Sequence, residues 1–294
     1  MKKSIRIGNS SGFWGDDPNA MLRQVSGGHL DYITSDYLAE VSMSILQKQQ
    51  DKNTEKGYVE DFITHFIDAA HVIKDRSIRL LTNAGGNNPL ACGQRILKEL
   101  ENLGIQMSVA VVEGDHVMHL LPSLFPKEES FENSETKESF DDKYPFIKSA
   151  NAYVGLAPLV EALKMNAQII IAGRATDSAI AIAPMVYEYN WQLNDWDKLG
   201  SAMLAAHSIE CGTQSTGGNF TDWHLIDHWE DFGYPIIEVF PDATFNLTKH
   251  TNTGGLVSIN TVKEQLVYEI ADPKRYFSPD VIADLSKLKI EQID

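Results

Sequence analysis

The sequence predicts an α/β fold: a mainly parallel, Rossmann-like sheet flanked by helices, with glycine-rich loops at the strand ends. Short apolar runs alternate with segments of helical periodicity, which is typical of a parallel sheet. In addition, five polar, glycine-rich segments each follow a short apolar run. We number them the first to fifth glycine segments: GNSSGFWGDD (8–17), NAGGNNP (83–89), GRATDS (173–178), CGTQSTGGNFTDW (211–223) and HTNTGGLVS (250–258). Eleven of the twenty glycines lie in them.

Each expected strand is a short apolar run. The expected strands are 4–9, 30–35, 79–83, 107–112 and 167–172. The first alternates and then breaks into glycine, as a buried strand does where it enters a loop. The last contains three consecutive isoleucines, which suits a strand covered on both faces. A further pair, 234–240 and 243–250, could form around a Pro-Asp turn.

The expected helices show apolar residues spaced for one helical face. In the helix 37–50 this face consists of Leu38, Val41, Ile45 and Leu46. The helix 89–103 begins at a proline and stops at a glycine. The other expected helices are 59–73, 150–166, 178–188, 196–212 and 255–270.

The chain is expected to form a single domain, residues 1–294, with one insertion. Residues 127–144 are charged and poor in apolar residues, which predicts a mobile surface insertion, or alternatively an active-site lid. The net charge of -16 disfavours a nucleic-acid or anionic-membrane partner, because such surfaces require a basic face. The negative net charge does not exclude a small anionic ligand, because backbone amides of a loop can bind an anion at short range.

Features of secreted and membrane proteins are missing from the sequence. The start has no apolar region of signal-peptide length, and no run approaches the ~18 apolar residues of a membrane helix. The two cysteines, Cys92 and Cys211, are far apart and form no disulfide framework or CxxC pattern. We therefore expect a cytoplasmic protein.

The glycine segments are the expected ligand site, because loops at the carboxyl ends of parallel strands line one binding edge. Glycine permits positive φ and close approach of a ligand to the backbone. The alternative is five ordinary turns. The candidate ligand-binding residues are Gly12, Asn83, Gly85, Gly86, Asn87, Arg174, Ser215, Thr216, Gly217, Gly218, Asn219, Lys249, Gly254 and Gly255.

Two cations stand out in this set. Arg174 could hold a carboxylate or phosphate in its guanidinium fork. Alternatively, it could form an ion pair with Asp177 that braces the turn. Lys249 suits an anionic ligand or a polarised carbonyl, although it could equally be a solvated residue at the sheet edge.

The candidate catalytic residues are Asp177, His207 and Cys211. Asp177 could act in catalysis or cap the helix that follows it. Cys211 could be a nucleophile beside His207, one helical turn earlier, or a buried structural cysteine. His207 and Glu210 could serve as acid and base or form a plain helix contact. Convergence of these groups on one cleft with two further acids, Asp36 and Glu40, would indicate an enzyme, whereas scatter would indicate a binding protein.

No metal site is predicted, and the cofactor is left unassigned. Two segments carry metal-ligand residue types, but the glutamate of an HExxH motif is missing. Their residues are Glu113, Asp115, His116 and His119, and His224, His228 and Asp231. The first glycine segment lacks GxGxxG spacing, and no GxxxxGK[ST] occurs, so dinucleotide and P-loop sites are unsupported.

Several long motifs resemble the N-terminal region of the acyclic terpene utilisation AtuA-like family. They are IGNSSGFWGD, LDYITSDYLAEVSMSIL, TNAGGNNP, VVEGD, GRATDSA, IECGTQSTGGNFTDW, KHTNTGGLVS and YEIADPKRYFSPDV. The resemblance covers almost the whole chain except 127–144. This family is associated with bacterial gene sets that degrade citronellol- and geraniol-type terpenes through acyl-CoA intermediates. Many members continue further, and 286–294 looks like a strand leading onward, so a split or truncated form is expected.

The resemblance implies a catabolic enzyme acting on a small carboxylate or acyl-CoA-type substrate. A lyase- or hydrolase-like reaction is the expected class. The alternative is a non-catalytic ligand-binding or partner subunit of an acyl-CoA degradation pathway. The expected partners are thus a small anionic or acyl-CoA-type ligand and either a second copy of the chain or a separate C-terminal partner chain.

Overall fold

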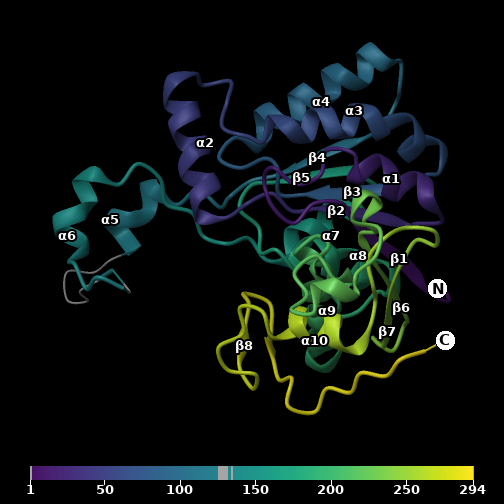
Figure 1. The fold of residues 1–294 in the computed structure, drawn as a ribbon. Helices are drawn as coiled ribbons and strands as arrows, with labels where there is room; N and C mark the ends of the chain where they lie inside the picture. Colours follow the sequence, from purple (N-terminus) through teal and green to yellow (C-terminus); the bar gives the residue numbers. More distant parts are fainter. Residues whose placement is uncertain (1, 125–131, 134, 294) are drawn as a thin grey trace.

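A seven-stranded sheet forms the centre of the protein (Figure 1). The computed structural model describes residues 2–124, 132–133 and 135–293. The strand order is β4-β5-β3-β2-β1-β6-β7, and the first five strands of this order are parallel. β6 is antiparallel to both of its neighbours. The strands are β1 Ile5–Asn9, β2 Tyr32–Ser35, β3 Arg79–Thr82, β4 Val109–Val112, β5 Ile169–Ala172, β6 Pro235–Val239 and β7 Phe245–Lys249. The predicted mixed α/β fold with a mostly parallel sheet is confirmed.

Helices cover both faces of this sheet. In Figure 1, α1, α3 and α4 lie on one side of the sheet, and α7, α8 and α9 lie on the other. Their bounds are α1 Ala20–Gly27, α3 Glu60–Asp75, α4 Pro89–Leu103, α7 Leu156–Lys164, α8 Ala179–Tyr189 and α9 Trp196–Glu210. Ile169 and Ile171 pack with the first group, while Ile170 packs with the second. The three isoleucines therefore contribute to the hydrophobic cores on both faces of the sheet, because successive side chains of a strand point to opposite faces.

Local signals explain where individual helices begin and end. The Asn88 side chain accepts a hydrogen bond from the amide of Ala91, and Pro89 opens α4. Gly104 ends that helix with a φ of 68°, a left-handed conformation that glycine adopts without steric cost. α10 (Ile259–Val267) begins after Ser258, whose hydroxyl accepts from the amide of Thr261. Such caps satisfy amides that have no partner within the helix.

The helix α2 (Glu40–Lys52) departs from the sequence prediction. The expected apolar face is only partly buried. Leu38 and Leu46 are covered, but Val41 is 72% exposed and Ile45 is 42% exposed. α2 lies to one side of the α3–α4 layer in Figure 1 and buries Ser42 and Met43 instead. The fold thus leaves an apolar stripe of this helix uncovered.

Three segments differ from their expected structure. The helix predicted from 150 begins only at Leu156, because the preceding backbone forms isolated bridges at Asn151 and Val154. Helix α1 was not predicted. No strand forms within the described residues 286–293. The antiparallel pair β8 (Tyr276–Phe277) and β9 (Ile282–Ala283) precedes that segment.

The described part of the charged insertion that contains α6 lies away from the sheet in Figure 1. Residues 127–131 and 134 of the insertion lie outside the described residues, so its predicted mobility is not tested. The short helices near it are η1 Met118–Leu120, α5 Leu121–Leu124, α6 Phe140–Lys143 and η2 Tyr144–Phe146. The remaining short helices are η3 Gln214–Thr216, η4 Trp223–Leu225 and η5 Trp229–Asp231.

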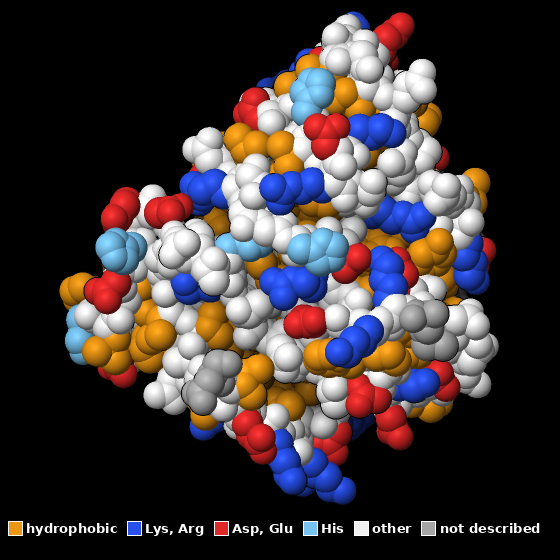
Figure 2. All heavy atoms as spheres, turned by 90° about the vertical axis from the view of Figure 1, so that its right-hand side faces the viewer, with side chains coloured by type: hydrophobic (Ala, Val, Ile, Leu, Met, Phe, Trp, Pro, Cys, Tyr) orange, Lys and Arg blue, Asp and Glu red, His pale blue; other side chains and the backbone are white. Residues whose placement is uncertain are grey.

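Two further observations concern the surface. Basic and acidic side chains are interspersed on the face shown in Figure 2. Among the residues that the structure describes, no helix combines the length and the hydropathy needed to cross a membrane.

Candidate functional site

Five parallel strands bring distant segments to one edge of the sheet. β1 to β5 end at Asn9, Ser35, Thr82, Val112 and Ala172. β6 runs in the opposite direction, so its first residue, Pro235, pairs with the last residue of β7, Lys249. Ile236 pairs with Gly8. The segments after β1 to β5, the one before β6 and the one after β7 therefore lie along the same edge, where ligands bind in open α/β sheets.

The fourth glycine segment contacts both the first and the fifth. A Cβ on Gly12 would lie 2.4 Å from the backbone nitrogen of Gly212 and 2.5 Å from the carbonyl carbon of Cys211. No other residue fits there without movement of the backbone. The amide of Leu256 donates to the Thr216 carbonyl at 2.7 Å. The missing side chain at Gly12 thus brings the fourth segment against the end of β1.

The second and third segments join the same edge through backbone hydrogen bonds. The Gly85 amide donates to the Ala172 carbonyl at 3.1 Å, next to the third segment. The Asp36 amide donates to the Ser11 carbonyl at 2.9 Å, which links the end of β2 to the first segment. Asp36 therefore lies among residues from three different strand ends.

Asp36 is buried and held in one orientation. Only 4% of the residue is exposed. Its Oδ1 accepts a hydrogen bond from Asn83 Nδ2 at 2.6 Å and another from the Leu38 amide at 3.1 Å. Burial raises the pKa of Asp36 well above its usual value, and the negative charge of Asp177 raises it further, whereas the Asn83 hydrogen bond opposes the shift. Asp36 accordingly holds its proton to a higher pH than an ordinary aspartate does.

Asp177 is the partner of Asp36. Burial raises the pKa of Asp177 to about 6, against the opposing effect of the Arg174 charge. The charge of Glu210 raises this pKa further, and the interaction with Asp36 lowers it. The Asp177 side chain is still 36% exposed. Two interacting carboxyl groups with raised pKa values, one of them partly accessible, form a pair suited to proton transfer.

The Arg174 guanidinium is held beside Asp177 by hydrogen bonds. Its NH1 group donates to Asp177 Oδ1 at 2.6 Å, and its NH2 group donates to the Tyr153 hydroxyl at 3.3 Å. NH2 also lies 3.9 Å from Glu40 Oε1, and only 6% of the side chain is exposed. This geometry favours the bracing ion pair over a free anion-binding fork. A role of Arg174 in ligand binding stays a prediction.

A second polar group lies at the carboxyl end of α9. His207 Nδ1 and Glu210 Oε1 are 2.6 Å apart, and the Tyr276 hydroxyl lies 3.3 Å from the same nitrogen. Burial of His207 opposes its protonation, but the Glu210 carboxylate outweighs this effect and raises the pKa of His207. The contact with Glu210 therefore favours the protonated form of His207.

Several buried atoms around α9 have no partner among the described residues. They are His207 Nε2, Glu210 Oε2, Ser215 Oγ and Gln265 Oε1. Gln265 Nε2 donates to the His207 carbonyl at 2.8 Å, so α10 packs directly on this group. Buried polar atoms rarely stay unsatisfied, and a cluster of them indicates a place for the polar groups of a ligand.

The two polar groups influence each other electrostatically. The charge of Glu210 raises the pKa of Asp177, and the charge of Asp177 raises that of Tyr276. Asp36, Asp177 and the His207–Glu210 pair therefore converge on one region of the edge. We call this region the acid site.

The structure disfavours Cys211 as a nucleophile. Burial raises the pKa of the Cys211 thiol, and the Glu210 charge raises it further. The reactive form of cysteine is the thiolate, which these surroundings destabilise. Three further residues near these groups lie outside the glycine segments and were not predicted: Tyr276, Gln265 and Tyr153. For Tyr276, the signal was its place in the long motif YEIADPKRYFSPDV.

The other candidate ligand residues make contacts within the fold. Asn83 binds Asp36 and also accepts from the Tyr37 amide at 2.9 Å. Lys249 Nζ donates to the Thr253 carbonyl at 2.7 Å. Neighbouring loops pack closely on Gly85, Gly86, Gly217, Gly218, Gly254 and Gly255, and Asn87 and Thr216 donate to backbone carbonyls. Ser215 is buried, and Asn219 is exposed. The ligand role of each stays a prediction.

The candidate metal ligands in the described part of the chain do not form a metal-binding cluster. Within the described part of the chain, no three side chains of His, Cys, Asp or Glu are placed to hold a metal ion. His224 and His228 do not share a helix, because η4 ends at Leu225 and His228 has a left-handed backbone. Asp115 accepts from the Arg174 amide at 2.9 Å and from Asn151 Nδ2 at 2.8 Å, so it supports the third glycine segment.

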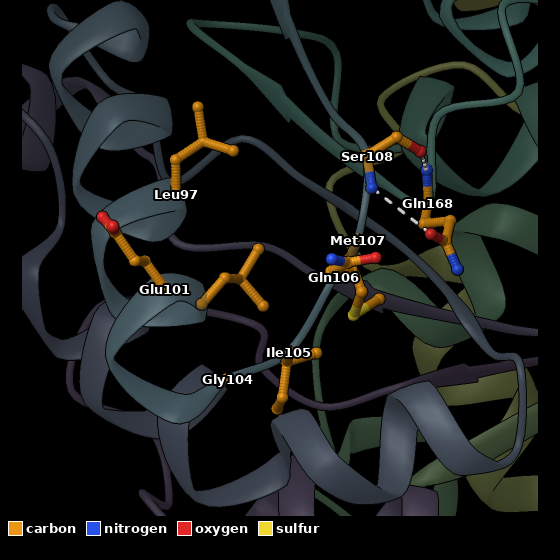
Figure 3. Close-up of a pocket in the computed structure, with 9 residues that line it drawn as sticks. Leu97, Glu101, Gly104, Ile105, Gln106, Met107, Ser108 and Gln168 are labelled. Carbon is orange, nitrogen blue, oxygen red and sulfur yellow. Dashed lines mark hydrogen bonds between the residues drawn. The ribbon is translucent and has the colours of Figure 1, made fainter.

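A pocket of about 570 Å³ lies away from the acid site. Figure 3 shows it between Leu97 and Glu101 of α4 on one side and Met107 and Gln168 on the other. These last two residues precede β4 and β5, so the pocket opens at the amino-terminal edge of the sheet. It contains none of the candidate catalytic residues.

Comparisons with known proteins identify the family. The model of the acyclic terpene utilisation family protein AtuA matches residues 5–294. Comparison with curated proteins gave no match. Comparison with solved structures also gave none. Since the family model spans nearly the entire chain, the protein belongs to the acyclic terpene utilisation AtuA family.

Proposed function

We propose that this AtuA-family protein is a catabolic enzyme that acts on a small carboxylate or acyl-CoA-type substrate by general acid–base chemistry at the acid site. The observation that carries the proposal is the Asp36–Asp177 pair, in which a partly exposed carboxyl group with a pKa of about 6 interacts with a buried carboxyl group whose pKa is also raised. A base whose pKa lies near the working pH combines an adequate deprotonated fraction with adequate basicity. Family membership supports a role in acyclic terpene utilisation.

The burial of each group suggests its role. Asp177 is exposed enough to touch a substrate, and we assign it as the group that accepts the proton. Asp36 and Arg174 are almost fully covered, so they act through Asp177 by setting its pKa and orientation. We assign His207 and Glu210 as the groups that return a proton to the product. Four acidic residues lie in or beside the acid site: Asp36, Glu40, Asp177 and Glu210. The anionic part of a substrate should therefore bind away from these residues, with a neutral carbonyl nearest Asp177.

The test is solvent exchange. Purified protein is incubated in D₂O with a panel of carboxylates and acyl-CoA thioesters, and ¹H NMR follows deuterium incorporation beside the carbonyl as well as new products. We expect exchange or turnover with at least one member, and a rate that rises with pH through about 6 as Asp177 loses its proton. A protein that binds panel members but exchanges no proton and forms no product at any pH would instead be the non-catalytic subunit.

A further inference from the structure

We infer that an apolar groove beside the acid site binds an apolar chain of the substrate. The groove has a volume of about 540 Å³, within the range of small-molecule sites. One wall is the first glycine segment, with Gly12, Phe13 and Trp14, and the other is the start of α2. The inference rests on the proposed function, which it extends from the reacting group to the substrate class.

The lining explains the uncovered face of α2. Leu38, Val41 and Ile45 all line the groove. Val41 is 72% exposed, Ile45 42% and, across from them, Phe13 59%. Val41 and Ile45 have the spacing of residues on the core-facing side of a helix, yet both are exposed to solvent. A concave cluster of exposed apolar side chains marks a binding surface more often than a scattered set does.

Both walls of the groove begin at the acid site. The Asp36 amide donates to the Ser11 carbonyl, and the groove residues Gly12 and Tyr37 directly follow these two residues. Glu40, the first residue of α2, lies 3.9 Å from Arg174 NH2. A ligand with its carbonyl near Asp177 would thus have an apolar channel next to it.

This continuity favours a substrate chain over other occupants of the groove. A flat apolar surface would suit a second protein, whereas this one is concave and ends at a polar, proton-transferring group. The chemistry that fits is an acyl group of several carbons presented as a thioester, because the thioester carbonyl beside Asp177 is neutral whereas the carboxylate of a free acid is not.

The experiment compares chain lengths. Binding of octanoyl-CoA and acetyl-CoA, and of octanoate and acetate, is measured by calorimetry, and the two pairs separate a thioester from a free acid. We expect the octanoyl ligand of at least one pair to bind at least about tenfold tighter, because each buried methylene strengthens binding. In the double variant Val41→Asn, Ile45→Asn the preference should fall below about threefold.

A matched control separates the groove from a general loss of apolar surface. Leu90 and Leu97 on α4 are 49% and 50% exposed, and their double change to asparagine should leave the chain-length preference intact. Equal binding of long and short chains by the parent, or an unchanged preference in the groove variant, overturns the inference. So does a dimer of the parent that the groove variant dissociates while the preference stays, because a second copy would then be the occupant.

The outcome is independent of the proposed chemistry. A chain-length preference located at the groove, with no proton exchange at any pH, would retain the groove and reject the enzyme. Proton exchange without a chain-length preference would retain the enzyme and reject the groove as the site of the substrate chain.

Discussion

Replacing Asp177 with asparagine is expected to lower the rate of the solvent-exchange reaction by about 10²- to 10⁴-fold, the usual contribution of a general base. Asparagine retains the shape and can still accept a hydrogen bond from Arg174, but its amide cannot take up the proton. Substrate binding should change far less than the rate, since the groove residues are untouched. The measurement is the exchange rate at saturating substrate, with circular dichroism to show that the variant is folded.

The matched control is Asp195→Asn, which removes a carboxylate at the start of α9, away from the acid site. It should leave the exchange rate within about twofold of the parent, because only groups near the reacting atoms change the barrier. An Asp177→Asn protein that exchanges as fast as the parent would show that another residue is the base.

Gly12→Ala is expected to destabilise the protein by about 1–3 kcal/mol, the range for an overpacked position. The new methyl group would meet backbone atoms of Cys211 and Gly212 at 2.5 and 2.4 Å, and backbone yields less readily than a side chain. The fourth glycine segment would have to move away from β1, and with it the end of α9 that carries His207. We expect a lower Tm together with slower exchange.

Gly200→Ala is the control for this substitution. Gly200 lies inside α9, and nothing lies within 4 Å of a Cβ built there. This change should stabilise the protein by about 0.5–1 kcal/mol, because alanine loses less backbone entropy in a helix. If Gly12→Ala melts at the temperature of the parent, the close contact between the first and fourth glycine segments does not hold in solution.

The strands were predictable because each is a short apolar run that a two-sided core must cover. Ile169 to Ile171 illustrate this, since both faces of β5 are buried. The exposed stripe of α2 could not be predicted, because the spacing of Val41 and Ile45 is that of any core-facing helix. Only the position of the helix beside the sheet decides which of its faces is covered.

The acid site was predictable in part. Arg174 and Asp177 follow the clearest strand, and their ion pair was one of the two alternatives stated for them. The interaction of Asp177 with Asp36 could not be predicted, because it depends on β2 and β5 lying on either side of β3. The properties of Cys211 also depend on tertiary structure, since burial and the Glu210 charge together set its pKa. Sequence supplies the residue types, but the protonation states follow from their surroundings.

The most direct test of the acid–base assignment is a ¹³C NMR titration of aspartate carboxyl groups. The account predicts one resonance that titrates with a midpoint near about 6 and disappears in Asp177→Asn. It also predicts a second resonance, absent from Asp36→Asn, that keeps its proton to higher pH than an ordinary aspartate. If every aspartate resonance instead titrates at or below the usual value of about 4, the Asp36–Asp177 pair has no raised pKa values and the proposed chemistry is wrong.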